Sequence, residues 1–201
     1  MNDDPLQKAR ALFEQGMKYD EINDWENALA SYSQALQYNR KLMVAYLRLG
    51  HVYIYQNDYD NALLTFDKAI QCDPKYVPTY QSRIAIYVAR EDYEHALDDA
   101  NTVLRLDPDR GFNYEMRGNI HRHFNEYELA IADYTEAILF DGTLDFVYME
   151  RGIAYEKIHD YKNAIADFDL FSISDTASGL GDMADLQDRI NNLKQLLEQN
   201  S

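Results

Sequence analysis

Apolar and small residues recur along the chain in two short segments that repeat every 34 residues. Within each repeat they occupy positions 4, 8 and 11 and then positions 20, 24 and 27, which is helical spacing in two separate stretches. Position 20 is the clearest marker, since it is alanine every time: Ala28, Ala62, Ala96, Ala130 and Ala164. A self-similarity of this period predicts an array built from one helix–turn–helix unit.

Alignment on the alanines places the repeats at residues 9–42, 43–76, 77–110, 111–144 and 145–178, after an N-terminal extension at 1–8. Position 8 is glycine in all repeats except the third, and we expect it to face the alanine at position 20 where two antiparallel helices cross closely. Proline after Asp73 and Asp107 is expected to end two of the second helices. Polar pairs suited to a tight turn and an N-cap separate the helices: Asn23-Asp24, Asn57-Asp58, Glu91-Asp92, Asn125-Glu126 and His159-Asp160.

A separate segment follows the last repeat. Residues 172–181 are rich in Ser, Asp and Gly, which predicts a loop. Residues 182–199 then predict an amphipathic helix with Asp182 as N-cap and an apolar face made by Met183, Leu186, Ile190, Leu193 and Leu197. Terminal repeats need a polar outer surface, so we interpret it as a capping helix; an oligomerisation helix is the alternative.

The repeat pattern, with an aromatic at position 4, Gly at 8, Tyr at 11, Ala at 20, an aromatic at 24, Ala at 27 and Pro at 32, resembles the tetratricopeptide repeat (TPR) family. The resemblance implies an all-α fold, a TPR superhelical solenoid of antiparallel helix pairs with a C-terminal capping helix. Three departures stand out, Ile84 in place of Gly, Ala100 in place of an aromatic and Phe171 in place of Ala. Two of them fall in repeat 3, where we expect the least regular helix packing.

Arginine at position 7 and aspartate at position 23 occur together in repeats 3 to 5 and are both absent from repeats 1 and 2. The arginines are Arg83, Arg117 and Arg151, and the aspartates are Asp99, Asp133 and Asp167. We predict an Arg–Asp bridge between the two helices of each of these repeats, a contact that favours register more than stability. An anion-binding role for the three arginines is the alternative.

In TPR proteins the first helices line a concave groove, mainly through positions 2, 5, 6, 9, 12 and 13. Phe112, Met116, Phe146 and Met149 would form an adaptable apolar patch there, and Glu115 and Glu150 beside them would favour a basic flank on the ligand. The alternative is that some of these side chains pack against neighbouring repeats or the capping helix. The resemblance assigns these candidate partner-binding residues: Leu47, Arg48, His51, Tyr55, Phe112, Glu115, Met116, Asn119, His123, Phe146, Met149, Glu150 and Ile153.

Two ligand codes of TPR proteins are absent. The carboxylate clamp for the acidic tails of Hsp70 and Hsp90 requires Lys, Asn, Asn, Lys and Arg at set positions of three repeats. Repeats 1 to 3 carry Phe13, Met17, Arg48, Pro78 and Ser82 at those positions, so these chaperone tails are not expected as partners. The asparagine ladder of O-GlcNAc transferase-type arrays is missing as well.

Composition narrows the partner further. The net charge is -16, from 35 acidic and 19 basic residues, which disfavours nucleic acid and anionic membrane surfaces; alternatively, the charge simply keeps a tyrosine-rich array in solution. Cys72 is the single cysteine, so neither a disulfide framework nor a thiolate metal site is expected. No catalytic motif, signal peptide or membrane-length apolar run is apparent. We therefore expect a cytoplasmic protein with no enzymatic activity and no cofactor.

These observations predict a non-catalytic scaffold or adaptor that binds a peptide or partner protein in the concave TPR groove, through an apolar ligand with a basic flank. A chaperone-like holder of secretion or assembly substrates and a self-assembling structural TPR module are the alternatives. Concentration-dependent mass would separate self-assembly from a monomeric adaptor.

Overall fold

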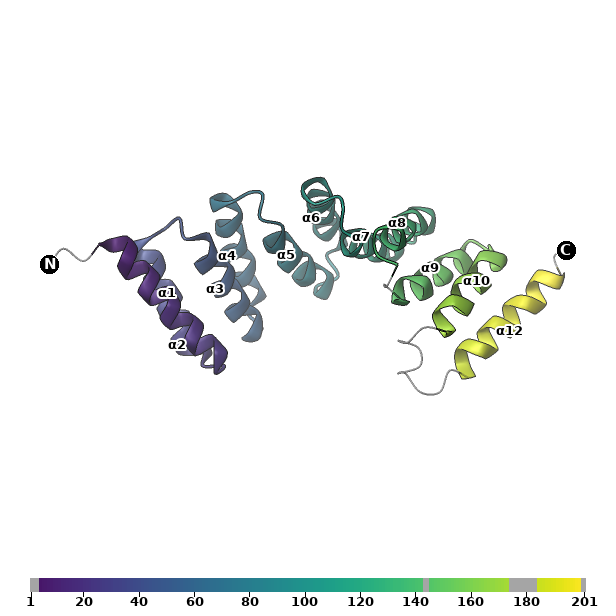
Figure 1. The fold of residues 1–201 in the computed structure, drawn as a ribbon, viewed down its shortest axis with the longest axis horizontal. Coiled ribbons are helices and arrows are strands. Elements are labelled where there is room, and N and C mark those ends of the chain that lie inside the picture. Colours follow the sequence, from purple (N-terminus) through teal and green to yellow (C-terminus); the bar gives the residue numbers. More distant parts are fainter. Residues whose placement is uncertain (1–3, 143–144, 174–183, 200–201) are drawn as a thin grey trace. The chain divides into compact units, whose positions relative to one another are not determined.

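The computed structural model describes residues 4–142, 145–173 and 184–199. These residues form eleven α-helices and no strand, which confirms the predicted all-α class (Figure 1). The helices are α1 (Pro5–Glu21), α2 (Trp25–Tyr38), α3 (Met43–Tyr55), α4 (Tyr59–Cys72), α5 (Val77–Ala89), α6 (Tyr93–Leu106), α7 (Gly111–His123), α8 (Tyr127–Phe140), α9 (Asp145–Lys157), α10 (Tyr161–Ser172) and α12 (Ala184–Gln199).

The chain divides into two compact units, residues 1–91 and 92–201. In unit 1, α1 packs against α2, α3 against α4, and α5 against α4. In unit 2, α7 packs against α8 and α9 against α10. In addition, α6 packs against α7, and α12 packs against α10. The division falls between α5 and α6, inside the repeat that lacks the position-8 glycine.

The turns between paired helices share one backbone conformation. Each contains a non-glycine residue with φ between 57° and 63°, namely Asn23, Asn57, Glu91, Asn125 and His159. After α1, for example, the Asp24 N–H donates to the carbonyl of Tyr19 at 2.9 Å, which satisfies an end-of-helix acceptor by the Schellman arrangement. The polar residue before each N-cap therefore adopts the left-handed conformation that reverses the chain.

Aspartate caps the following helix, as predicted. The side chains of Asp24, Asp58 and Asp160 each accept a hydrogen bond at 3.2 Å from the backbone N–H three residues later, and Asp92 does so at 3.4 Å. The prediction is wrong for Glu126, whose longer side chain makes no cap hydrogen bond and instead lies 2.7 Å from His121 Nδ1.

Close helix crossing depends on glycine meeting an aromatic ring. A Cβ atom on Gly16 would lie 2.6 Å from the Tyr32 ring, and one on Gly118 would lie 2.8 Å from the Tyr134 ring. We had expected glycine to face the alanine at position 20, but its nearest neighbour is the ring at position 24. The ring occupies the space that a side chain on the glycine would fill.

Helix ends follow the sequence closely. The helices α4 and α6 end at Cys72 and Leu106, immediately before the Asp-Pro pairs, as predicted. At the other end of the chain α1 begins at Pro5, inside the segment assigned to the N-terminal extension, because Asp4 accepts a hydrogen bond from the Leu6 N–H at 3.0 Å.

The helix α12 lies against α10 and fits the predicted capping role (Figure 1). Leu186, Ile190 and Leu193 are buried against Phe168 and Phe171, while Leu197 is 36% exposed. The extra volume of Phe171, which stands where alanine is usual, fills the contact with this helix. The predicted N-cap Asp182, Met183 and most of the predicted loop lie outside the described residues. Among the helices described, none has the length and apolar character needed to cross a membrane.

Candidate functional site

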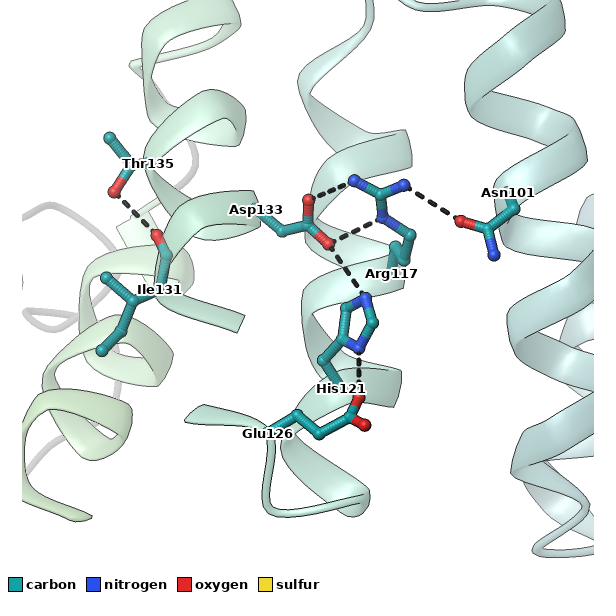
Figure 2. A network of polar contacts seen from close by, with 7 residues as sticks. All are labelled: Asn101, Arg117, His121, Glu126, Ile131, Asp133 and Thr135. Atoms are coloured by element: carbon teal, nitrogen blue, oxygen red, sulfur yellow. Dashed lines mark hydrogen bonds and ion pairs between the residues drawn. The ribbon is translucent and has the colours of Figure 1, made fainter. Parts of the chain in front are cut away.

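The arginines of repeats 4 and 5 form the predicted bridges, and Figure 2 shows the one made by Arg117. Arg117 donates to both carboxylate oxygens of Asp133 at 2.8 and 2.6 Å. Arg151 donates to both oxygens of Asp167 at 2.8 Å. The aspartate side chains are only 6% and 5% exposed, so these are bidentate pairs inside the helix packing. Arg83 and Asp99 belong to different units.

Arg117 and Arg151 each also contact the preceding repeat. This contact was not predicted from the sequence. The third guanidinium nitrogen of Arg117 donates to Asn101 at 3.0 Å, and that of Arg151 donates to Thr135 at 3.1 Å. Arg83 makes the equivalent contact with Asp67. All three acceptors occupy position 25, so the arginines have a structural role, which argues against the anion-binding alternative for Arg117 and Arg151.

In unit 1 the predicted residues Arg48, His51 and Tyr55 line one pocket of about 260 Å³. Its other walls are Met17, Asp20, Glu21, Asn23 and Trp25. The Tyr32 hydroxyl donates to Asp20 at 2.9 Å, and Arg48 lies 4.0 Å from the same carboxylate. Arg48 is 48% exposed, so this pocket presents a cation to the solvent.

His51 is oriented by neighbours on two other helices. Its Nε2 lies 2.9 Å from the Ser82 hydroxyl, which itself donates to the Pro78 carbonyl, so the histidine nitrogen is the donor. The ring also meets Phe66 edge-on at 5.6 Å. Burial and then the charge of Arg48 lower the pKa of His51 below its usual value, against the opposing effect of Asp20. His51 is therefore a neutral group at physiological pH.

Aromatic stacking holds the two predicted residues at position 13. Tyr55 is 60% exposed, yet its ring stacks on Trp25 with centroids 4.4 Å apart. In unit 2, His123 stacks on Tyr93 at 4.2 Å in the equivalent pairing. Both rings keep one face available to a ligand while the other face is packed.

In unit 2 we define the α7–α9 face by Phe112, Glu115, Met116, Asn119, Arg122, Phe146, Met149, Glu150 and Ile153. Phe112 and Phe146 are 48% and 50% exposed. Phe146 also contacts Phe171 at 5.6 Å, so its ring is supported from below. The face therefore offers two large apolar side chains, one on each helix.

The helices α7 and α9 also carry a polar network. Arg122 Nε and Glu150 Oε2 are 3.0 Å apart as an ion pair, although neither atom makes an aligned hydrogen bond. The Tyr134 hydroxyl donates to Asn119 at 2.8 Å. Burial and then the nearby charge of Glu150 raise the pKa of Glu115 above its usual value. The two glutamates outnumber the single arginine, so the network carries excess negative charge.

The structure removes some predicted residues from the exposed surface. Leu47 is 8% exposed and packs in a core cluster with Phe66 and Ile86, so that assignment is wrong; position 5 of repeat 2 faces the next helix rather than a ligand. Met149 and Ile153 are partly buried against the cluster that contains α12, as the packing alternative anticipated.

The site residues Asp20, Trp25, Tyr32 and Tyr134 were not predicted from the sequence, whereas Arg122 occupies position 12, one of the predicted groove positions. A signal was present at position 24, where Tyr32 and Tyr134 alternate with Phe66 and Phe168. A hydroxyl added to an otherwise buried ring needs a polar partner, and both tyrosines find one on the preceding helix. Within the described residues no group of three or more His, Cys, Asp or Glu is arranged to hold a metal ion.

Comparison with solved structures identifies the fold. A tetratricopeptide repeat protein from Parabacteroides merdae aligns with a TM-score of 0.79 at 18% identity, covering 96% of this chain and 75% of that one. MamA aligns with a TM-score of 0.78 at 18% identity, covering 88% of this chain and 97% of that one. YrrB, described as a TPR protein with an unusual peptide-binding site, aligns with a TM-score of 0.71 at 19% identity, covering 80% and 83%. These likenesses confirm the predicted TPR fold.

The sequence itself matches one family. Residues 1–195 match the ETO1 C-terminal domain family, and the chain belongs to that family. No curated protein matches the chain in sequence.

Proposed function

We propose that this member of the ETO1 C-terminal domain family is a non-catalytic adaptor that binds a peptide or partner protein through the α7–α9 face, in the groove that TPR proteins form with their first helices. The observation that carries the proposal is the pair of half-exposed rings, Phe112 and Phe146, on the same two helices, α7 and α9, as a polar network with excess negative charge. Apolar side chains of the ligand would pack on the rings.

Charge selects the flank of that ligand. Glu115 and Glu150 face a single arginine, and their mutual repulsion is relieved when a cation approaches. A lysine or arginine next to the apolar residues of the ligand would supply that cation. Nucleic acid and anionic membranes are disfavoured by the net charge of -16, and the cytoplasm is the proposed compartment.

Peptide binding by YrrB, a protein of the same fold, is compatible with this reading. A self-assembling module or a holder of secretion substrates would use the same exposed rings. Light scattering over a range of concentrations separates the self-assembling module from the adaptor. The mass of an adaptor stays constant, whereas that of a self-assembling module increases with concentration.

The test is calorimetric titration with short synthetic peptides that place leucine and phenylalanine beside two lysines. We expect the Phe112→Ala/Phe146→Ala double variant to bind at least about tenfold more weakly, since interface rings commonly contribute 1.4 kcal/mol or more together. The control is Leu139→Ala, which removes a 75% exposed apolar side chain from α8 of the same unit. Equal affinity of the wild type and the double variant would refute the proposal.

A further inference from the structure

A second pocket, in unit 1, has the opposite chemistry to the rest of this acidic chain. It encloses about 280 Å³ and is lined by Arg40, Lys41, Tyr46, Lys68, Gln71 and Cys72. Three of these six residues are cationic and none is acidic. We call it the basic pocket.

The three cations of the basic pocket have no carboxylate to neutralise them. Within the part of the chain that the structure describes, Arg40, Lys41 and Lys68 form no ion pair, whereas Arg48, Arg83 and Arg90 of the same unit each lie against an aspartate. The carboxylate next to Lys68 in the chain, Asp67, is taken by Arg83. In a chain with 35 acidic and 19 basic residues, unneutralised cations gathered in one cavity are unexpected for a purely structural surface.

The pocket is assembled from three segments of unit 1. Arg40 and Lys41 lie in the connection after α2, Tyr46 lies on α3, and Lys68 and Cys72 lie one turn apart on α4. The Cys72 thiol donates to the Arg40 carbonyl at 3.8 Å, which joins the end of α4 to that connection. The backbone segments that carry the cations are therefore joined to each other.

A second cavity, lined by both apolar and polar side chains, adjoins the cations. It measures about 430 Å³, shares Arg40, Tyr46 and Lys68 with the basic pocket, and is further lined by the apolar or aromatic residues Leu36, Leu49, Tyr53 and Leu64 and by the polar residues Ser33, Gln37, Asn61 and Thr65. A ligand with an anionic head and an adjacent apolar side chain would meet both.

We propose that the basic pocket binds a phosphorylated side chain of a protein partner, with a neighbouring apolar residue in the adjoining cavity. One carboxylate is satisfied by one arginine, whereas a phosphate monoester carries nearly two charges at pH 7 and three acceptor oxygens. Arg40 supplies a planar fork for two of those oxygens, and Lys41 and Lys68 supply point charges for the rest. The Tyr46 hydroxyl and the Gln71 amide add neutral donors.

The structural alternative is that these cations only stabilise helix C-termini. Arg40 and Lys41 follow the end of α2, and Lys68 precedes the end of α4 by one turn, where positive charge is favourable. That role predicts a change in stability without any affinity for phosphate, and it is separable by experiment.

Cys72 provides the readout, because it is the single thiol of the chain and lines the pocket. The rate of its modification by a neutral disulfide reagent is measured in the full chain with increasing amounts of a phosphoserine-leucine peptide. We expect saturable protection by the phosphopeptide and none by the unphosphorylated peptide. In Arg40→Gln/Lys68→Gln the affinity deduced from protection is expected to fall at least tenfold. The control, Lys157→Gln/Lys162→Gln, removes the same charge from exposed lysines of unit 2 and is expected to behave as wild type.

Three results would overturn the proposal. Equal protection by both peptides would exclude phosphate recognition. Equal protection by inorganic phosphate at the same concentration would show an anion site with no partner segment. Binding to vesicles of anionic phospholipid that is lost in the double variant would assign the pocket to a lipid headgroup. Lys68→Gln alone, checked by circular dichroism for retained helix, repeats the measurement with a smaller change.

Discussion

The two units repeat the same helix pair but hold its buried tyrosine hydroxyl with different partners. In unit 1 the Tyr32 hydroxyl is held by Asp20, and the cation Arg48 stands exposed beside it. In unit 2 the equivalent Tyr134 hydroxyl is held by the neutral Asn119, and Glu150 pairs with Arg122. The comparison teaches that the repeat frame determines where a side chain points, while a few unrepeated positions decide what it would bind.

The units also differ in how their helices are joined at position 23. Unit 2 uses the bidentate pairs of Arg117 and Arg151. Unit 1 has Thr65 there, whose hydroxyl donates to the Asn61 carbonyl of its own helix at 2.6 Å. One unit therefore has charged contacts between paired helices where the other has a local neutral one.

The largest expected effect tests the difference between the two units at position 23. Asp167→Ala leaves the 15% exposed Arg151 without its carboxylate, and we expect a loss of about 3 kcal/mol in the free energy of unfolding. Thr65→Ala, at the same repeat position, is expected to lose about 1 kcal/mol or less. Urea unfolding followed by circular dichroism measures both. Losses of equal size would show that the ion pair contributes no more to stability than the neutral hydrogen bond.

A smaller effect tests the two tyrosines. Tyr32→Phe removes a hydrogen bond to a carboxylate and is expected to lower stability by about 1.5 kcal/mol, whereas Tyr134→Phe removes one to an amide and is expected to lose about 1 kcal/mol. Phe66 and Phe168 at the same position show that the ring alone fits. Thermal unfolding of the two variants gives the order, and a reversed order contradicts the assigned partners.

Peptide affinity tests the role of the negative charge on the α7–α9 face. Glu115→Gln/Glu150→Gln keeps the shape of the α7–α9 face but removes its negative charge, so affinity for the lysine-flanked peptide should fall about tenfold, or 1.4 kcal/mol. Glu128→Gln/Glu136→Gln makes the same change on exposed positions of α8 and serves as the control. Arg48→Gln, in the other unit, should leave the affinity unchanged. If the two glutamine pairs weaken binding alike and Arg48→Gln strengthens it, the overall charge acts rather than this face.

The smallest effect is a pH dependence of opposite sign in the two units. Since the folded pKa of His51 is lowered, its neutral form is favoured in the fold, and stability is lost as pH falls below about 6.5 toward that lowered value. Since the folded pKa of Glu115 is raised, its charge is disfavoured, and stability is lost as pH rises from about 4.3 through the raised value. Urea unfolding of His51→Gln and Glu115→Gln across this range should remove one slope each. Unchanged slopes in both variants would contradict the two assignments.

The structural features that recur from repeat to repeat were predictable from the sequence. The turns, the aspartate caps, the Asp-Pro helix ends and the Arg117 and Arg151 bridges all follow from residues at constant spacing, because each contact is made within one repeat. Exposure on the candidate faces was less predictable. Leu47 is buried because the following helix covers it, and that depends on how successive repeats stack rather than on local pattern.

The basic pocket lay beyond the sequence comparison for the same reason. Its cations come from a connection and from a second helix, positions that the groove assignment ignores. Only their meeting in space, without an ion pair to a carboxylate among the described residues, distinguishes Arg40 and Lys68 from ordinary surface charges.

The reach of the position-7 arginines to position 25 of the preceding repeat has a consequence for how such a chain is lengthened. Residues 111–144 carry both halves of this contact, Arg117 as donor and Thr135 as acceptor for the arginine that follows. A tandem copy of this segment would bring its own joint at each end, so gene duplication can extend the array without inventing a new junction. The side chains at positions 7 and 25 therefore allow one repeat to be joined to the next.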